Sequence, residues 1–379
     1  MRQRLVGVVE AITSERSGVQ ELSVRPARFC ASSEPPNTEA PLRAALNYVE
    51  LTGRVEVGDS VQLNTIAVEM GLGTGGRDFV VTVLNRPETE ATPKGHIVKL
   101  RYTPLQIPVL AVEAPESPHH EAVSLFATLD DLPVVCAELH SQLPAICAAA
   151  TWALHEHGWP RTPRIAYIMT DGAALPLALS RLVSQMKACG LITATITAGQ
   201  AFGGDYEAVN LYSALATAKQ VVGADIIVVS QGPGTVGTAT QLGFSGVDQG
   251  LAINAVASLG GVPITVARLS FADARDRHQG ISHHTLTVLK HIARAPSLLP
   301  LPRLTASQLS KVLKTLEEAG ITEEHQPITI DADKGLAALE TYGLQITTMG
   351  RSVTEERPFF LASAAAGLLA AQLVEAHSP

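Results

Sequence analysis

The sequence after Pro163 alternates short apolar runs with longer segments of helical periodicity. The short runs are apolar at almost every position, as strands covered on both faces require, and parallel strands need helical connections between them. This alternation predicts a doubly wound, mostly parallel α/β sheet over residues 163–379. The expected strands have the sequences RIAYIMT, LITATITA, ADIIVVS, PITVARLS, PITID and LQITTMG.

Residues 1–112 follow a different pattern, in which short alternating runs are separated by turn signals. This pattern predicts a small β-barrel or sandwich, and Gly58-Asp59 predicts a hairpin turn between two of its strands. Residues 113–162 are expected to form a helical connector, because apolar positions recur every three or four residues in VVCAELHSQLPAICAAATWALHEHG. A chain of 379 residues is long enough for two or three such parts.

Composition bears on the partners and the location of the protein. The net charge is −8, so no positive field would attract the chain to nucleic acid or to anionic lipid. The uncharged stretch Pro358–Val374 is rich in alanine and short for a membrane span, which favours a buried helix. The N-terminus lacks a secretory apolar core, and no CxxC pair occurs among Cys30, Cys136, Cys147 and Cys189. We therefore expect a cytoplasmic protein with no membrane or nucleic-acid partner, and a homo-oligomer remains open.

Polar and glycine-rich segments follow the predicted strands of the α/β region. Because all loops that follow parallel strands emerge at one edge of the sheet, these segments are expected to line one crevice. Asp171 follows the first strand, and Asp205 lies in the loop after the second. An aspartate in such a place can be a general base or a metal ligand, although Asp205 could equally cap the next helix.

The segment Gly232–Gly237 matches the pattern G-x-G-x-x-G after the third strand. It is a poor dinucleotide fingerprint, since no helix clearly opens at Gly237 and no acid ends the next strand at the required spacing. The first acid beyond that strand is Asp273. A dinucleotide cofactor is therefore disfavoured. The backbone of Gly232, Gly234, Thr235 and Gly237 is expected to cradle a phosphate or carboxylate, with a purely structural turn as the alternative.

The segment RLSFADARDRHQGISHHT has the densest chemistry in the chain. Ser282 is expected to cap a helix that begins at His283. A first interpretation is a divalent metal site formed by Asp273, His278 and one of His283 or His284, with His284 as the choice. His283 and His284 are not expected to be ligands together, because adjacent residues on a helix point about 100° apart.

Two other interpretations of the same segment stay open. Arg275 and Arg277 could clamp a carboxylate or phosphate while His278 or His283 transfers a proton. Alternatively, a lattice of ion pairs could simply fasten the loop. The residues of that lattice would be Asp273, Arg275, Asp276 and Arg277.

Several segments together resemble a known family: ALNYVELTGRVEVGDSVQLNT, GLGTGG, KLRYTPLQ, MTDGAALPLALSRLV, AFGGDYEAVN, GPGTVGT and SFADARDRHQGISHHT. Over about residues 1–375 the chain resembles the bacterial proteins of domain of unknown function 3866. The resemblance implies an intact two-domain bacterial protein and transfers no activity. Gln200 stands where the family pattern has His, and Ala239 where it has Gly, so the resemblance implies no proton-transfer or ligand role for residue 200.

These features predict a cytoplasmic enzyme, a hydrolase or group transferase, that acts on a small anionic metabolite at the carboxyl edge of the sheet. A divalent metal is a candidate cofactor, and the poor dinucleotide match argues against hydride transfer. A non-catalytic protein that senses a metabolite, or a scaffold, would explain the same domain pairing. The residues expected to carry catalysis are Asp171, Asp205, Asp273, His278 and His283.

Overall fold

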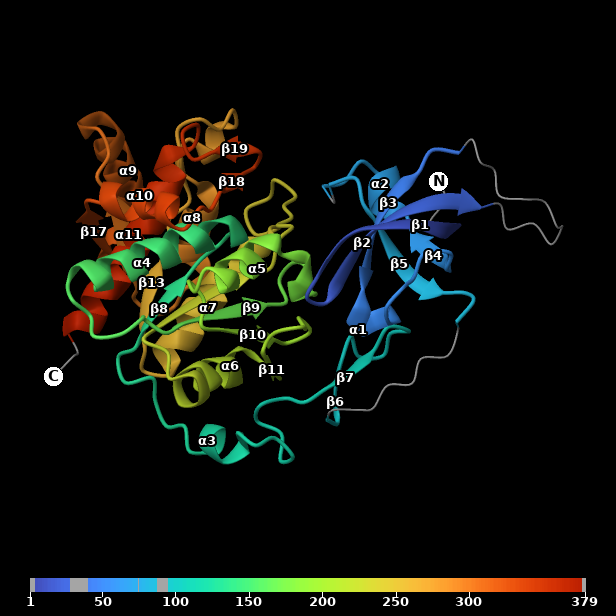
Figure 1. Cartoon of the computed structure of the whole chain (residues 1–379). Helices are drawn as coiled ribbons and strands as arrows, with labels where there is room; N and C mark the ends of the chain where they lie inside the picture. The colour runs from blue at the N-terminus through green and yellow to red at the C-terminus, as the bar shows by residue number, and fades with distance from the viewer. Residues whose placement is uncertain (1–3, 28–39, 74, 87–94, 377–379) are drawn as a thin grey trace. The chain divides into compact units, whose positions relative to one another are not determined.

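The computed structural model describes residues 4–27, 40–73, 75–86 and 95–376 (Figure 1). The chain divides into two compact units, Met1–Val109 and Leu110–Pro379. The boundary lies close to the one expected at residue 112. The segment 113–162, expected as a separate connector, instead belongs to the second unit, to which it contributes a strand and a helix of the main layers.

The first unit contains a closed barrel, which confirms the predicted β-barrel. Its strands follow the order β1-β2-β3-β5-β4, with β3 and β5 parallel and the other pairs antiparallel. Inward-facing Val9, Leu22, Val61 and Leu63 form the centre of its core. The elements of this unit are β1 (Arg4–Arg16), β2 (Val19–Ala27), β3 (Arg43–Tyr48), α1 (Val49–Thr52), β4 (Ser60–Asn64), α2 (Ile66–Glu69), β5 (Asp78–Val83), β6 (Ile97–Lys99) and β7 (Ile107–Val109).

The expected hairpin at Gly58-Asp59 is not formed. Gly58 does turn with φ +95°, and its N–H donates to the carbonyl of Val9. Residues 53–57 are not a strand, however, so the turn leads into β4 from a loop. Asp59 fixes this loop by accepting a hydrogen bond from the N–H of Glu56 and pairing with Arg86.

The second unit is built on an eight-stranded sheet in which every pair of neighbours is parallel, so the predicted parallel α/β fold is confirmed. The order is β11-β10-β9-β12-β8-β13-β16-β17. The strands are β8 (Pro133–Cys136), β9 (Ile165–Thr170), β10 (Ala194–Ala198), β11 (Tyr206–Ala208), β12 (Ile226–Gln231), β13 (Val262–Thr265), β16 (Leu298–Pro302) and β17 (Gln326–Ile330). Three segments were not expected as strands: β8, β11 and β16.

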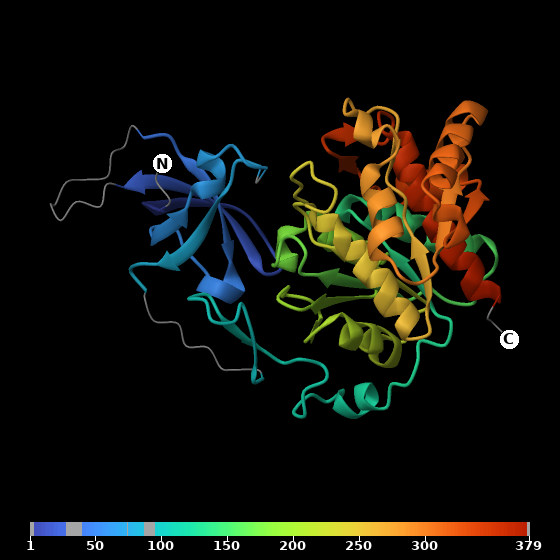
Figure 2. The same cartoon turned by 180° about the vertical axis from the view of Figure 1, so that it is seen from behind.

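Helices cover both faces of this sheet (Figures 1 and 2). The side chains of β9 show the division, since Ile165, Tyr167 and Met169 join one core and Ala166 and Ile168 join the other. The first core contains α4 (Leu143–Glu156), α5 (Arg181–Ala188), α10 (Asp333–Thr341) and α11 (Arg357–Ala376). The second contains α6 (Leu211–Thr217), η3 (Ala218–Val222), α7 (Asp248–Ser258), η6 (Val288–Ile292) and α9 (Ala306–Glu318).

Short elements complete the second unit. The expected strand LQITTMG is reduced to a two-residue strand that pairs with the next one, because the segment lies outside the main sheet. These elements are α3 (His120–Ser124), η1 (His140–Gln142), η2 (Leu177–Leu179), η4 (Ser245–Val247), β14 (Leu269–Ser270), η5 (Asp276–His278), β15 (Gly280–Ile281), α8 (His283–Thr287), η7 (Ile321–Glu323), β18 (Thr347–Thr348) and β19 (Arg351–Ser352).

Helix α11 lies in the core rather than on the surface. By length and composition it could cross a membrane, but 78% of its most apolar window is buried within the unit. It packs against α4 so closely that a Cβ on Gly367 would lie 2.1 Å from the carbonyl oxygen of Ile146. The alanine-rich sequence therefore serves close helix packing, as expected for a buried C-terminal helix.

Candidate functional site

The carboxyl edge of the sheet brings together side chains from β8, β9, β12 and β13. At one end of this edge, Asp171 follows β9 and accepts a hydrogen bond from the N–H of Gln200 at 2.8 Å. Nearby, Thr170 donates to Asp248 at the start of α7. Burial and the charge of Asp171 raise the pKa of Asp248. The end of β9 thus contacts the loop after β10 and the start of α7, which adds the carboxylate of Asp248 to this part of the edge.

A buried ion pair lies in the middle of the edge. Glu138 follows β8, and its Oε1 lies 3.2 Å from Arg268 and 2.6 Å from Nδ1 of His284. Gln231, the last residue of β12, donates to the carbonyl of Glu138 at 3.0 Å. Burial raises the pKa of Glu138, but the His284 hydrogen bond and the Arg268 charge outweigh it and hold this pKa below its usual value. Glu138 is therefore an ionised carboxylate that joins two strands to the histidine-rich segment.

Three histidines form a cluster next to this pair. His278 ends η5, and His283 and His284 begin α8 behind Ser282, whose hydroxyl accepts from the N–H of His284 as a helix cap. One ring nitrogen from each of His278, His283 and His284 lies within 4.8 Å of the others. Burial lowers the pKa of His278 to about 3 and of His283 to about 4, so both rings are neutral near pH 7.

The expectation that His283 and His284 point apart is wrong. Their ring centroids are 4.4 Å apart with planes at 62°. The 100° angle holds for the Cα–Cβ bonds, but imidazole rings are long enough to turn back toward each other. Phe244 stacks on His284 at 3.8 Å, which holds this ring in place.

Asp273 lies outside the histidine cluster, in an ion-pair group of its own. Its carboxylate accepts from Arg275 at 2.7 Å and from Arg351 at 3.4 Å, and Arg351 also pairs with Glu356 at 2.5 Å. The hydrogen bonds from Arg275 hold the pKa of Asp273 well below its usual range. Asp273 and Arg275 thus form the kind of ion-pair lattice considered above, and Arg351 and Glu356 take the places expected for Asp276 and Arg277.

A cavity of about 460 Å³ opens beside the histidine cluster. His283 lies in its wall together with two cationic residues, Arg277 and Lys290. Neither of these two is paired with a carboxylate in the described parts of the chain, in contrast to Arg275. The other lining residues are Ala239, Gln241, Leu286 and Thr287. The cavity is therefore positively charged and in contact with a neutral imidazole.

The glycine segment lies at the same edge but only partly as expected. Gly232 allows a close approach, since its Cβ would lie 2.5 Å from the carbonyl oxygen of Ala174. Gly234 has φ +97°, and no helix opens at Gly237, which instead bridges to Phe244. Thr235 bonds to Gln231 and Ser245. The segment leads to Ala239 at the cavity, whose φ of +62° lies in the left-handed region that favours glycine.

Asp205 lies away from this group of residues. Its carboxylate accepts from the N–H and hydroxyl of Thr195, at the beginning of β10, and pairs with Lys187. The loop after β10 runs back along the strand, because β11 begins beside Ile196. The expectation that Asp205 completes the carboxyl-edge crevice is therefore not met, and its carboxylate fastens the amino end of β10.

A further buried histidine at this edge, His140, should make the stability of the protein depend on pH. His140 lies 2.7 Å from Ser180 and 3.1 Å from Tyr167, and burial lowers its pKa to about 4. Between about pH 6.5 and about pH 4, the unfolded chain therefore takes up a proton that folded His140 does not. The free energy of unfolding should therefore decrease as the pH is lowered through this window, by up to about 1.4 kcal/mol per pH unit for this group. The His140→Gln variant lacks this group. Its unfolding free energy, measured by urea denaturation at several pH values, should depend on pH less steeply, by the equivalent of one proton.

The control is His155→Gln, which changes an exposed histidine of α4. Its unfolding free energy should keep the pH slope of the wild-type protein. Equal slopes in the His140 variant and the wild type would contradict the assignment.

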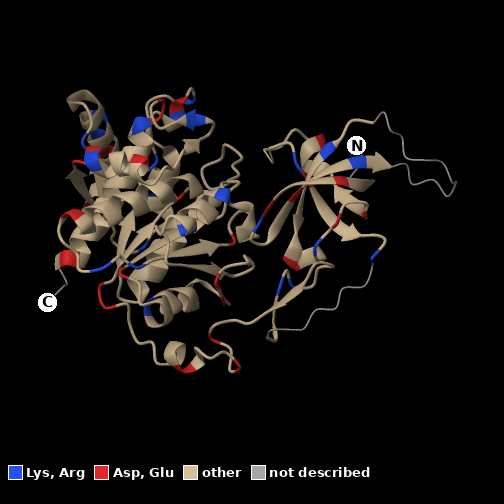
Figure 3. Ribbon diagram, viewed as in Figure 1, with Lys and Arg blue, Asp and Glu red and all other residues tan. Residues whose placement is uncertain are grey.

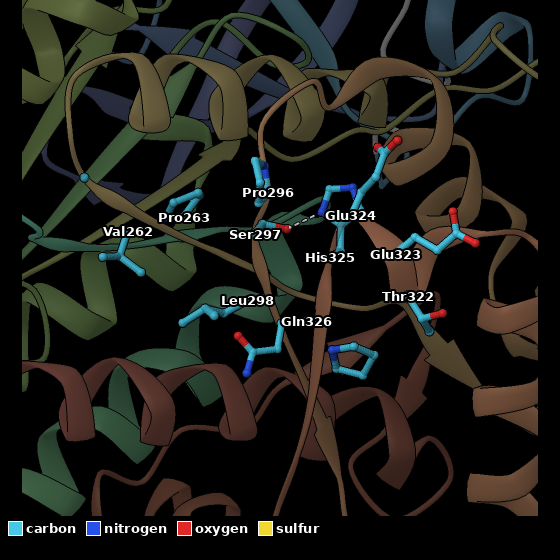
Figure 4. Close-up of a pocket in the computed structure, with 12 residues that line it drawn as sticks. Val262, Pro263, Pro296, Ser297, Leu298, Thr322, Glu323, Glu324, His325 and Gln326 are labelled. Atoms are coloured by element: carbon cyan, nitrogen blue, oxygen red, sulfur yellow. Dashed lines mark hydrogen bonds between the residues drawn. The ribbon is translucent and has the colours of Figure 1, made fainter.

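A second hollow, of about 430 Å³, lies at the opposite edge of the sheet (Figure 4). Its wall contains the first residues of β13, β16 and β17. Ser297 and His325 face each other there at 2.9 Å, and Ser297 also bonds to Thr265. The other ring nitrogen of His325 bonds to the carbonyl of Leu289. Both ring nitrogens are thus used within the fold, which points to a structural role for this pair.

The sequence did not indicate Glu138 or Asp248 as site residues. Glu138 stands two residues after a strand, as the polar residues of the other loops do, but the sequence pattern predicts a helix over this strand. Asp248 opens a helix and resembles an ordinary first-turn acid. Cys136, Cys147 and Cys189 are free thiols, and Cys30 lies outside the described residues.

The fold and the site define an α/β protein with an added β-barrel unit and a histidine-rich site at the carboxyl edge of a parallel sheet. The chain belongs to the family described as protein of unknown function (DUF3866), whose model matches residues 44–367. No curated protein and no solved structure matches the chain.

Proposed function

We propose that the second unit is a hydrolase or group transferase that binds a small anionic molecule beside the histidine cluster. The observation that carries this proposal is the cavity in which Arg277 and Lys290 meet His283. An anionic group held by the two cations would lie next to neutral imidazoles, which are the groups most used for proton transfer near pH 7.

The attraction for an anion is local to this cavity. The chain carries a net charge of −8, and Lys and Arg are interspersed with Asp and Glu over both units (Figure 3). Arg277 and Lys290, which have no carboxylate partner among the described residues, would therefore select an anion at short range. Asp171 and the segment Gly232–Gly237 stand further along the same edge, and in this proposal they contact the remainder of the ligand.

The reactive groups in this proposal are the imidazoles of His278, His283 and His284. They support either of two chemistries, transfer of a proton or coordination of a metal ion. Glu138 supports both, because a carboxylate that accepts from Nδ1 of His284 orients the ring and raises the basicity of Nε2.

The test is calorimetric titration with inorganic phosphate, a minimal anion. We expect wild-type protein to bind it and Arg277→Gln and Lys290→Gln each to weaken binding by roughly 10- to 100-fold, the value of one charge-assisted hydrogen bond. Lys314→Gln is the control, since this exposed lysine of α9 is 74% accessible and should leave binding unchanged. The proposal is contradicted if the wild-type protein does not bind phosphate. It is also contradicted if both cavity variants bind phosphate as tightly as the wild type does.

A second experiment distinguishes catalysis from sensing. The small molecule that copurifies with the protein is identified by mass spectrometry, supplied again to the protein, and analysed after incubation. A product that differs from the supplied ligand after incubation supports an enzyme. A ligand that stays bound and chemically unchanged supports the non-catalytic alternative, in which the same cavity senses a metabolite.

A further inference from the structure

We propose that His278, His283 and His284 form a binding site for a divalent transition-metal ion of the zinc type. This deepens the proposed function, and it rests on that function only for the use of the metal in chemistry. The ring nitrogens of the three residues lie within 4.8 Å of one another. Nitrogens bound to one tetrahedral zinc lie about 3.4 Å apart, so small rotations of the rings would close the site.

The side-chain hydrogen bonds of His278 and His284 are made by the Nδ1 atom of each ring. Nδ1 of His284 donates to Glu138 at 2.6 Å, and Nδ1 of His278 is 2.8 Å from the hydroxyl of Ser282. Nδ1 of His284 also lies 3.2 Å from Arg268. Nε2 of both rings makes no hydrogen bond among the described residues, and it is a metal donor in the tautomer that carries its proton on Nδ1. Carboxylate and hydroxyl partners on the outer nitrogen are the usual supports of metal-bound histidine.

His283 supplies the independent observation. Its Nε2 is buried and has no hydrogen-bond partner among the described residues. A buried polar atom without a partner is uncommon because it loses its hydrogen bonds to water. A bound cation would satisfy this nitrogen directly. The ring centroid of His283 lies 5.0 Å from that of His278 and 4.4 Å from that of His284, so one ion can reach all three rings.

The donor set and the cavity together indicate the kind of site. Three imidazoles suit zinc and its first-row neighbours better than calcium or magnesium, which prefer oxygen. Three protein ligands leave a fourth position open, as in catalytic rather than structural zinc sites. His283 lies in the cavity wall, so the open position would be reached by water or by an oxygen of the anion that Arg277 and Lys290 attract.

The experiment measures metal content and affinity of the full chain. After removal of bound metal with EDTA, zinc is titrated in competition with a chromophoric chelator. We expect one zinc ion per chain for the wild type and affinity at least about 100-fold lower for His278→Ala, His283→Ala and His284→Ala. His291→Ala is the matched control, since this exposed histidine follows on the same helical run and bonds only to Gln241 among the described residues.

Thermal denaturation with and without zinc shows whether a variant that does not bind zinc is still folded. Zinc should raise the melting temperature of the wild type and of His291→Ala, but not that of the partly exposed His283→Ala, which keeps the fold. Wild-type protein that binds no zinc, or a His283→Ala variant that binds zinc like the control, overturns the metal site.

The two proposals fail separately. Zinc binding without phosphate binding leaves the metal site standing and overturns the anion proposal. Phosphate binding that needs Arg277 and Lys290, in a protein that binds no zinc, does the reverse.

Discussion

Glu138→Ala is expected to lower the free energy of unfolding by about 3–5 kcal/mol. The side chain of Glu138 is fully buried, and it is the partner of Arg268, which is itself 6% exposed. Removing the carboxylate leaves a buried guanidinium without a counter-charge and takes the acceptor from His284. Urea denaturation of wild type and variant measures the difference.

Two controls define what this loss means. Asp331→Ala removes a surface pair with Arg303, whose side chain is 69% exposed, and should change stability by less than about 1 kcal/mol. The double variant Glu138→Leu with Arg268→Met removes both charges and should recover much of the loss. If Glu138→Ala is no more destabilising than Asp331→Ala, the buried ion pair does not hold the edge together.

Gly367→Ala should destabilise the protein by about 3 kcal/mol, although alanine is the better helix former. The added Cβ would lie 2.1 Å from the carbonyl oxygen of Ile146 and 3.1 Å from the backbone nitrogen of Ala150, both on α4. Backbone atoms of a buried helix cannot move alone, so α4 and α11 would have to separate along their contact. Chemical denaturation reports the change in stability.

The matched control is Gln372→Ala on the exposed side of α11. It should change stability by no more than about 0.5 kcal/mol. A Gly367→Ala variant as stable as the wild type would show that the two helices tolerate a wider spacing.

The fold class could be predicted because it depends on a repeated pattern. The strands β9, β10 and β12 are short runs without charged residues that can be recognised individually, and their helical connections require a parallel sheet. The central strand β8 could not be recognised, since only residues 137–142 separate it from α4 and apolar positions recur at helical spacing through the whole stretch. A strand that short has no period of its own, and only its neighbours in the sheet identify it.

The site was predictable to a similar degree. The rule that ligands bind after parallel strands located Asp171, the glycine segment and the histidine-rich segment at one edge. The rule does not specify side-chain partners. Asp273 and Arg275, two residues apart, satisfy each other, whereas His284 finds its partner in Glu138, far away in the sequence. Such choices depend on tertiary distances that local spacing does not contain.

The pairing of α4 with α11 also bears on how the chain folds. These two helices come from opposite ends of the second unit's sequence, yet they cover the same face of the sheet. During synthesis, α4 and the strands β8 and β9 emerge long before the helix that covers them. Until α11 is made, the apolar surface of α4 that it covers has no partner, and we expect this late, long-range docking step to slow the folding of the nascent unit.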